Sequence, residues 1–489
     1  MNILFIMSDS LVPHLTGAYG DRAGGTPNLD RLATRGTVFE NAYCNSPLCA
    51  PSRASLVTGR YVSELGAFDN ASEFSSEWPT VAYALASEGY ETTLAGKMHF
   101  IGHDQLHGLD YRMALESDYS TGFNTQAYAI AYSWEKPPRG NPVGVDWMGP
   151  SYVNSEKWDD YPRHYDDDQT THQAALEYLA GKRPGGSPFF CCVSYHAPHN
   201  PFWIPERFKE PFRDKELPLP SIPDGIDTCH GPMDDWLNTF HYVPEVRDAM
   251  MREDNLRWLY ETYYGMVNYL DQCVGELLDA LQANGLAQDT AIVLTGDHGD
   301  MLAHRGMLQK RYLYERSVRV PLIFALPGRW QEGQRVSQPV SLVDLFPTFA
   351  EMGQAPVPAN LPGSSLLPTV SDGSAPEDRP VFCEYHGEGV HAPCFAVRSG
   401  DLKYIYVHGH EERLYNVAED PDEFSNLIAQ TEHTKDVSRL REELLRRFDP
   451  DSIAEKALVS QRNRGYILDC SQRGRRNNEP LPSTTKLPT

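Results

Sequence analysis

The feature that most constrains this chain is the alternation of short, continuous apolar runs with helical segments. The run from Ile3 to Met7 is typical of a strand that is buried on both faces. Pro188 to Val193 and Ala291 to Thr295 have the same character, and Glu91 to Ala95 indicates another extended segment. This order favours an α/β fold in which helices cover both faces of a large, mostly parallel sheet.

Helices are expected between these runs because capping and stop residues flank the periodic apolar positions. Thr26 supplies an N-cap and Pro27 a first-turn proline for one helix, which ends near Gly36. The other expected helices begin after Thr80, cover residues 166–181 and run from about Leu256 to Ala283.

The pattern changes from about residue 378, where short alternating segments replace the longer units. Ser399-Gly400-Asp401 is typical of a hairpin turn between two of these segments. The expected strands are Val381 to Tyr385, Cys394 to Arg398 and Leu402 to Val407, followed by a helix near residues 434–447. They indicate a small antiparallel C-terminal subdomain.

We therefore expect a large α/β domain over residues 1–377, an α+β subdomain over 378–469, and a tail or oligomerisation arm over 470–489. Residues 135–165 and 200–255 are rich in Pro, Trp and Asp, and they indicate long insertions over a site.

The net charge limits the partners of this chain. With 43 basic and 67 acidic side chains the formal charge is −24, so the surface would repel nucleic acids and anionic membranes. No segment has the ~20 consecutive apolar residues of a membrane span, and the N-terminus lacks the basic region of a signal peptide. The nine cysteines are an odd number without a CxxC pair, which favours reduced thiols and a cytoplasmic location.

Metal-binding and cationic side chains follow four of the predicted strands. Asp9 follows the first strand, and Lys97 with His99 follows the second. His199 follows the third, and the pair Asp297-His298 follows the fourth. The carboxyl ends of parallel strands lie at one edge of a sheet, where α/β proteins bind their ligands, so we expect these residues to converge.

Two carboxylates and an imidazole in this set indicate a divalent cation site. Asp9, Asp297 and His298 would supply hard oxygen donors and one nitrogen. The alternative for Asp9 is an ordinary turn residue after a strand.

The segment from Cys49 to Arg60 suggests a loop cysteine followed by a helix that begins at a proline. The helix N-terminus could hold an anion and lower the pKa of a thiolate, which would make Cys49 a nucleophile. A structural free cysteine is the alternative, and the residues alone leave both open.

Cys49-Ala50-Pro51-Ser52-Arg53 followed by Thr58-Gly59-Arg60 resembles the signature of the type I sulfatases of the alkaline phosphatase superfamily. In that family the cysteine is oxidised to formylglycine. The resemblance extends over nearly the whole chain, through Thr26 to Asp30, Gly96 to His99, His196 to Pro201 and Asp297 to Asp300. Within the family, Asp69 to Glu73 and Asp104 to Gly108 are similar to the choline sulfatase and arylsulfatase/phosphonate monoester hydrolase branch.

The resemblance implies an alkaline phosphatase-like fold and a nucleophile built on Cys49. Asp9, Asp297, His298 and the modified Cys49 would hold one divalent metal ion, with calcium expected and manganese or magnesium as alternatives. The hydrate of the formylglycine aldehyde would supply a hydroxyl whose pKa is lowered by the metal. Ser10 stands where relatives often have Asp, Gln or Asn, so a further side-chain ligand at this position is left open, and the hydroxyl of Ser10 would be a weaker one.

The resemblance also assigns roles around the sulfate group. Arg53 would orient the hydrate, and Lys97 and Lys310 would hold the sulfate oxygens. His199 would protonate the departing alcohol, and His99 would deprotonate the second hydroxyl to expel sulfate. Asn70 would add a hydrogen bond to the substrate. The alternatives are a solvated Lys97, a turn role for Asn70, and Lys310 as half of a basic pair with Arg311.

The expected activity is hydrolysis of a small organic sulfate monoester, with choline O-sulfate or a related alkyl or aryl sulfate as the best candidate. A quaternary ammonium group needs aromatic faces and carboxylates, for which Asp69, Glu384 and Glu388 are candidates. Hydrolysis of phosphonate monoesters or phosphodiesters is the alternative, and a non-catalytic anion-binding protein is a remote one. The resemblance further implies maturation by a formylglycine-generating enzyme and a homodimer or homotetramer.

Overall fold

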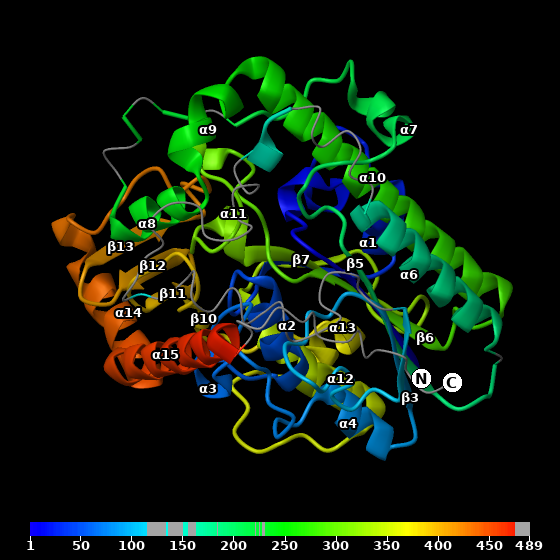
Figure 1. Cartoon of the computed structure of the whole chain (residues 1–489). Helices are drawn as coiled ribbons and strands as arrows, with labels where there is room; N and C mark the ends of the chain where they lie inside the picture. Colours follow the sequence, from blue (N-terminus) through cyan, green and yellow to red (C-terminus); the bar gives the residue numbers. More distant parts are fainter. Residues whose placement is uncertain are drawn as a thin grey trace.

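A nine-stranded sheet forms the centre of the molecule in the computed structural model (Figure 1), which describes residues 1–114, 134, 150–154, 163–182, 184–220, 222–223, 225–226 and 230–474. The strand order is β4-β3-β5-β1-β6-β7-β2-β8, and β9 pairs with β2. The strands are β1 (Asn2–Ser8), β2 (Thr37–Tyr43), β3 (Glu91–Gly96), β4 (Tyr111–Ala114), β5 (Phe189–Tyr195), β6 (Thr290–Gly296), β7 (Arg319–Ala325), β8 (Gln334–Val336) and β9 (Val340–Ser341).

Helices cover both faces of this sheet because its inner strands are apolar on both sides. In β1, Phe5 and Met7 belong to the core on one face, whereas Leu4 and Ile6 belong to the core on the other. The first face is covered by α2 (Cys49–Thr58), α4 (Val81–Ser87) and α12 (Leu345–Gly353), and the second by α1 (Pro27–Thr34), α6 (Arg163–Ala180) and α10 (Glu253–Ala283). The predicted α/β fold is thus confirmed.

The four central strands end together at one edge of the sheet. β1 is parallel to β5 and β6, and β3 is parallel to β5. Ser8 pairs in register with both Tyr195 and Gly296, the last residues of β5 and β6. The backbone N–H groups of Asp9 and Asp297 continue this pattern, since they donate to Tyr195 O and Ser8 O. The residues that follow these strands are therefore neighbours.

A second, antiparallel sheet packs beside the first and has the order β10-β11-β12-β13. Its strands are β10 (Val381–Tyr385), β11 (Cys394–Ser399), β12 (Leu402–Val407) and β13 (Glu411–Asn416), and α14 (Thr434–Arg447) and α15 (Pro450–Gly474) follow. The small antiparallel sheet was predicted, but β13 and α15 were not. The helix α15 continues through residues 470–474, the first residues of the expected tail or arm. Residues 475–489 lie outside the described part, and the domain boundaries remain a prediction.

Buried ion pairs join the two sheets. Lys403 of β12 lies with its Nζ 3.0 Å from Glu315 Oε1 and 2.9 Å from Glu423 Oε1. Tyr43 of β2 donates its hydroxyl to the other Glu315 oxygen at 3.0 Å. We refer to Lys403, Glu315 and Glu423 as the inter-sheet cluster.

The remaining described helices lie in the connections. They are α3 (Val62–Leu65), α7 (Glu206–Lys209), α8 (Pro232–Phe240), α9 (Val243–Met250), α11 (Glu315–Val318) and α13 (Leu367–Asp372). Much of the expected insertion over residues 135–165 lies outside the described residues, whereas the insertion over 200–255 contains α7, α8 and α9.

None of the helices among the described residues combines the length and the apolar character that a bilayer span requires. Eight cysteines of the described residues are free thiols, of which only Cys470 is exposed.

Candidate functional site

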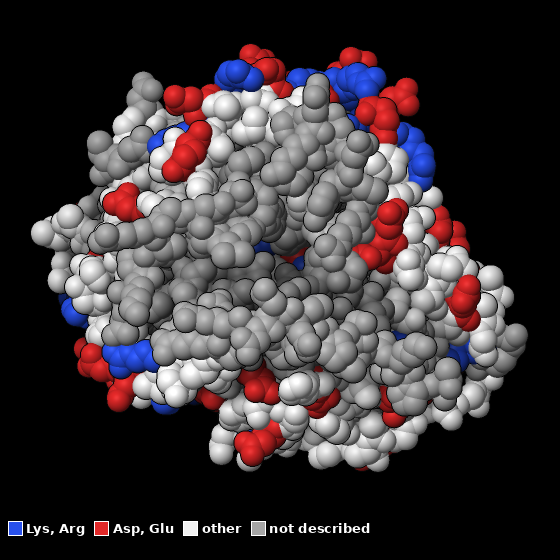
Figure 2. Space-filling view, in the orientation of Figure 1, with Lys and Arg blue, Asp and Glu red and all other residues white. Residues whose placement is uncertain are grey.

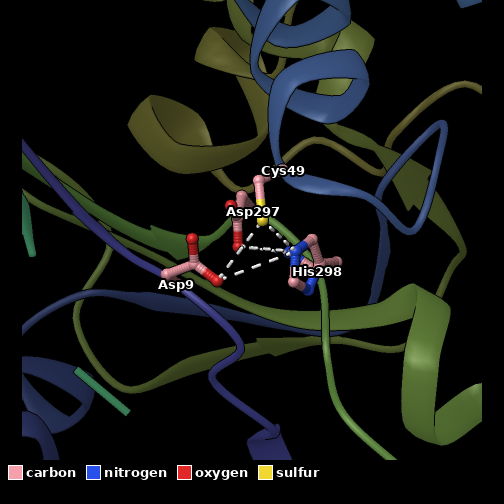
Figure 3. A group of neighbouring side chains, drawn as sticks. All are labelled: Asp9, Cys49, Asp297 and His298. Atoms are coloured by element: carbon pink, nitrogen blue, oxygen red, sulfur yellow. Dashed lines mark hydrogen bonds and ion pairs between the residues drawn. The ribbon is translucent and has the colours of Figure 1, made fainter. Parts of the chain in front are cut away.

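Four buried side chains meet at the carboxyl edge of the large sheet (Figure 3). Asp9 follows β1, Asp297 and His298 follow β6, and Cys49 is the first residue of α2. One potential ligand atom from each lies within 4.8 Å of the others. His298 Nε2 is 3.2 Å from Cys49 Sγ and 3.7 Å from an oxygen of each aspartate. We refer to these residues as the four-residue cluster.

In the four-residue cluster, the atoms that could bind a metal ion face one another. His298 Nδ1 is 2.9 Å from the carbonyl oxygen of Gly299, which can only accept, so Nδ1 carries the hydrogen and Nε2 the lone pair. Burial lowers the pKa of His298 and outweighs the charge of Asp297, which would raise it. The lowered pKa favours the neutral imidazole. Two carboxylate oxygens, a lone pair and a sulfur that face one another fit a divalent cation.

Two cations hold the outer oxygens of both carboxylates. Arg53 of α2 donates from Nε to Asp297 Oδ2 at 2.8 Å and from Nη2 to Asp9 Oδ2 at 3.3 Å. Lys97, which follows β3, places its Nζ 2.7 Å from the same Asp9 oxygen. Burial would raise the pKa of Asp9, but the charge of Lys97 overrides it and holds that pKa well below its usual range. The inner oxygens, Asp9 Oδ1 and Asp297 Oδ1, each lie 3.7 Å from His298 Nε2 and face the central point.

Arg53 is completely buried and connects four strand ends. Besides the two aspartates, its guanidinium contacts the backbone carbonyl of Lys97 and the hydroxyl of Ser194, the latter at 2.9 Å. A planar group with five donors suits this position, because each N–H meets an oxygen from a different segment. Arg53 therefore fixes the four-residue cluster as well as lying beside it.

The environment of Cys49 differs from the sequence-based expectation in two respects. Cys49 is itself the first helical residue, after the N-cap Leu48, and does not lie in a loop before the helix. Burial and the nearby Asp9 carboxylate raise the pKa of the Cys49 thiol to about 11, against the charges of Lys310 and Lys97. The expected lowering of its pKa is therefore wrong, because desolvation outweighs the positive charges. An unmodified thiol here is a poor nucleophile.

His199 and Lys310 form a contact next to the cluster. Lys310 Nζ lies 2.5 Å from His199 Nε2, and the same nitrogen is 4.0 Å from Asp9 Oδ1. His199 Nδ1 contacts the carbonyl oxygen of Asn200, so Nδ1 carries its hydrogen and Nε2 accepts from Lys310. Burial and the charge of Lys310 lower the pKa of His199.

The structure places the other predicted residues around this centre. Asn70 Oδ1 accepts from the Ala50 N–H at 3.1 Å, so its amide nitrogen is the group left to bind a substrate oxygen. Ser10 donates its hydroxyl to Asp9 Oδ1 at 3.0 Å and its N–H to Asp297 Oδ1 at 3.2 Å. His99 is buried, with a left-handed φ of 52°, two residues after Lys97.

The three carboxylates considered for an ammonium group are buried and have partners of their own. Asp69 forms a bidentate ion pair with Arg464 of α15. Nη1 donates to Oδ1 at 2.8 Å and Nη2 donates to Oδ2 at 2.7 Å. Glu384 lies 2.8 Å from a nitrogen of His386. The third, Glu388, accepts from a tyrosine hydroxyl at 3.1 Å and lies 3.8 Å from a guanidinium nitrogen of Arg311. Two of these carboxylates are therefore balanced by arginines.

Figure 2 shows that one face of the molecule is hollowed near its middle, and that acidic and basic atoms are both visible at the bottom of the hollow. In the orientation that it shares with Figure 1, the hollow lies between the labels of α11 and α2.

Sequence reasoning missed Asp168 of α6, whose carboxylate accepts backbone N–H groups from the segment that carries His199. The sequence contained evidence for this role, because Asp168 lies at helical spacing from the other residues of the buried face of α6. That face comprises His164, Asp168, Thr171, His172, Ala175 and Leu179. A lone carboxylate on a buried helix face needs hydrogen-bond donors from another element.

Comparison with known families shows which family the chain belongs to. The family model described as "Sulfatase" matches residues 1–355, which is well over half of the chain. The chain belongs to the sulfatase family. A second model, described as "N-sulphoglucosamine sulphohydrolase, C-terminal", matches residues 303–449 of this sulfatase.

Relatives cover almost the whole sulfatase. It is 32% identical to the choline-sulfatase of Rhizobium meliloti (strain 1021), over 97% of this chain and 92% of the relative. A solved 2-O GAG sulfatase superposes with a TM-score of 0.72 at 26% identity, over 93% of this chain and 92% of that one. The phosphonate monoester hydrolase of Agrobacterium radiobacter shares the fold, with a TM-score of 0.72 at 22% identity over 94% and 96% of the two chains. The protein is a sulfuric ester hydrolase of the alkaline phosphatase superfamily.

Proposed function

We propose that this sulfatase hydrolyses a small organic sulfate monoester to an alcohol and inorganic sulfate, and that choline O-sulfate or a related alkyl or aryl sulfate is its substrate. The single observation that carries the proposal is the four-residue cluster, flanked by Arg53, Lys97, His199 and Lys310. The similarity to a choline-sulfatase over 97% of the chain supports the substrate class.

The nucleophile in this proposal is Cys49 after oxidation to formylglycine (3-oxoalanine), carried out by a formylglycine-generating enzyme. The hydrated aldehyde supplies one hydroxyl for attack on sulfur and a second for release of sulfate. The support for this choice is the signature Cys49-Ala50-Pro51-Ser52-Arg53 together with the position of Cys49 in the four-residue cluster.

Asp9, Asp297, His298 and the modified Cys49 would hold one divalent cation, and we propose calcium, with manganese or magnesium as alternatives. The oxygen-rich donor set favours a hard cation. When bound, the ion supplies a positive charge that lowers the pKa of a hydroxyl at position 49.

The sulfate oxygens would lie against Lys97, Lys310 and the amide nitrogen of Asn70. Two buried ammonium groups neutralise the charge that develops on the sulfate oxygens during in-line displacement. Arg53, held by both aspartates, would orient the hydroxyls at position 49. In this proposal Arg53, Lys97 and Lys310 keep the positions that they have in the structure.

His199 would protonate the leaving alcohol, and His99 would remove the proton from the second hydroxyl. Lys310 Nζ lies 2.5 Å from His199 Nε2, so both groups lie where the leaving oxygen would take up its proton. We further propose a cytoplasmic location, on the basis of the cysteine usage. We also propose a homodimer or homotetramer, which the family resemblance implies.

Hydrolysis of phosphonate monoesters or phosphodiesters is the second candidate. Its support is the fold shared with a phosphonate monoester hydrolase and the tetrahedral geometry common to phosphoryl and sulfuryl groups. Asp69, Glu384 and Glu388 are already paired with other side chains, so none of them is assigned to the ammonium group of choline.

The test begins with the mass of the peptide around Cys49, which the conversion of thiol to aldehyde lowers. Enzyme with verified modification is then assayed on choline sulfate, 4-nitrophenyl sulfate, sugar sulfates and a phenylphosphonate monoester. We expect sulfate esters to be preferred, and Cys49→Ala to lose activity by a factor on the order of 10⁶, as when a covalent nucleophile is removed. A phosphonate preference of several orders of magnitude would establish the second candidate. Unmodified Cys49 without turnover would favour a non-catalytic anion-binding protein.

A further inference from the structure

Two buried residues of α6 face the segment that connects β5 to His199. His164 and Asp168 are four residues apart, so they lie on the same face of the helix. Both are buried, and Asp168 has no exposed surface. The segment opposite them runs from His196 to His199 and begins directly after β5, where the regular pairing of the strand ends.

Asp168 binds this segment through both carboxylate oxygens. Oδ1 accepts from the backbone N–H of His196 at 2.6 Å and lies 3.2 Å from His196 Nδ1. Oδ2 accepts from the backbone N–H of Ala197 at 2.9 Å. One carboxylate thus fixes two consecutive peptide groups and one imidazole ring, in a place where none of the described strands takes these donors.

The segment that Asp168 binds is connected to His199 by a backbone hydrogen bond and by ring packing. The N–H of His199 donates to the carbonyl oxygen of His196 at 2.8 Å, which closes a tight turn. The ring of His164 stacks on His196, with centroids 4.9 Å apart and planes at 13°, and it meets the His199 ring edge-to-face at 5.6 Å. The direction of His199 Nε2 therefore depends on a turn that Asp168 holds in place.

We propose that Asp168 is a positioning residue that aims His199 at the leaving group of the substrate. It touches no reacting atom and acts through His196 and Ala197. This inference rests on the proposed function, in which His199 protonates the departing alcohol. A misaimed acid slows only the reactions that need protonation.

The experiment uses this dependence on the leaving group. A nitrophenolate leaves readily without a proton, whereas an alkoxide requires one. Asp168→Asn keeps the volume of the side chain but replaces one acceptor oxygen by a donor. We expect kcat/KM to fall about 100-fold for an alkyl sulfate, as for a weakened general acid, and less than about 3-fold for 4-nitrophenyl sulfate. The ratio of the two values does not depend on the folded fraction, because misfolding lowers both equally.

Three further variants complete the design. Asp166→Asn changes an exposed carboxylate on the same helix and should leave the ratio unchanged. His199→Ala should shift the ratio in the same direction as Asp168→Asn. Asp168→Glu keeps the charge but moves the carboxylate by one methylene group, and it gives the same readout if the Asn variant does not accumulate.

Equal losses on both substrates in the Asp168 variants, with a selective loss in His199→Ala, would overturn the positioning role and leave the role of His199 intact. An unchanged ratio in His199→Ala would overturn both roles. No turnover of any sulfate ester by wild-type enzyme with modified Cys49 would instead refute the proposed function itself.

Discussion

The molecule contains two buried clusters of charge that are organised in opposite ways. In the inter-sheet cluster, Lys403 lies within 3.0 Å of both Glu315 and Glu423, so each charge faces one of opposite sign. In the four-residue cluster, oxygens of Asp9 and Asp297 and the lone pair of His298 face one another. The first cluster is complete without any further group, and the second is not.

This difference distinguishes a structural from a functional use of buried charge. A buried ion pair contributes to the fold when its partners satisfy each other, and removing one partner is costly. A set of converging acceptors has a favourable energy only when a cation binds between them. Loss of a cluster member should therefore affect stability in the first case and activity in the second.

The largest expected effect is on activity, from Asp297→Asn. This change removes one inner carboxylate of the four-residue cluster, and we expect kcat/KM for a sulfate ester to fall about 10³-fold. It should also abolish the increase in melting temperature that calcium gives to the chelator-treated enzyme, because binding energy adds to folding energy. Steady-state kinetics and calorimetry measure the two effects.

Asp289→Asn is the matched control for Asp297→Asn, since Asp289 is an exposed residue just before β6 and outside the site. It should retain full activity and the metal-dependent stabilisation. Wild-type enzyme that keeps its full rate after exhaustive chelation would contradict the cation site.

The next effect is on stability, from Lys403→Met. The substitution leaves Glu315 and Glu423 buried without their cation, so the free energy of unfolding should fall by about 3 kcal/mol. Activity per folded molecule should stay within about twofold, because the inter-sheet cluster holds no substrate. Urea unfolding followed by tryptophan fluorescence measures the change. Lys435→Met, on the exposed side of α14, should alter stability by less than about 0.5 kcal/mol. A Lys403 variant that is stable but inactive would reverse our assignment of the two clusters.

The smallest effect is the pH dependence of the pair between Asp69 and Arg464. Burial raises the pKa of Asp69, but the charge of Arg464 overrides it, so the folded pKa lies below the unfolded value of about 3.9. The stabilisation is therefore complete above that value and is lost as the pH falls through the lower folded pKa.

Arg464→Gln should reduce the free energy of unfolding by about 2 kcal/mol near neutral pH, and the difference from wild type should shrink below about pH 4. Urea titrations at several pH values measure it, with the exposed Lys456→Gln as control. A difference that is constant down to about pH 3 would show that Asp69 does not contribute through its charge.

The sequence predicted the inner strands well but missed others, for physical reasons. β7 contains Pro321, which normally argues against a central strand because it lacks an N–H. In the structure Pro321 lies opposite an irregularity in β2, where pairing passes from Phe39 to Ala42, and one residue beyond the pair that Leu322 forms with Thr295 of β6. The same irregularity breaks the alternation of β2, and its residues do not show a clear strand period.

The site could be predicted where a simple rule governs it. Asp9, Lys97 and Asp297 were predicted to be neighbours because each follows a strand of a parallel sheet. The prediction was correct because these strands are parallel and end in register. Lys310 lies in a loop without a strand, between two residues with left-handed φ, and only family resemblance pointed to it. The raised pKa of the Cys49 thiol depends on complete burial, which no local pattern reveals.

The inter-sheet cluster has a consequence for how the chain can be divided. Glu315 belongs to the large sheet's side of the molecule, and its cation comes from a strand almost ninety positions later in the sequence. A fragment that ends at residue 377 would contain Glu315 but not Lys403, so the glutamate would lack its counter-ion. The small C-terminal sheet is therefore no detachable module, and the enzyme is expected to fold and melt as one cooperative unit.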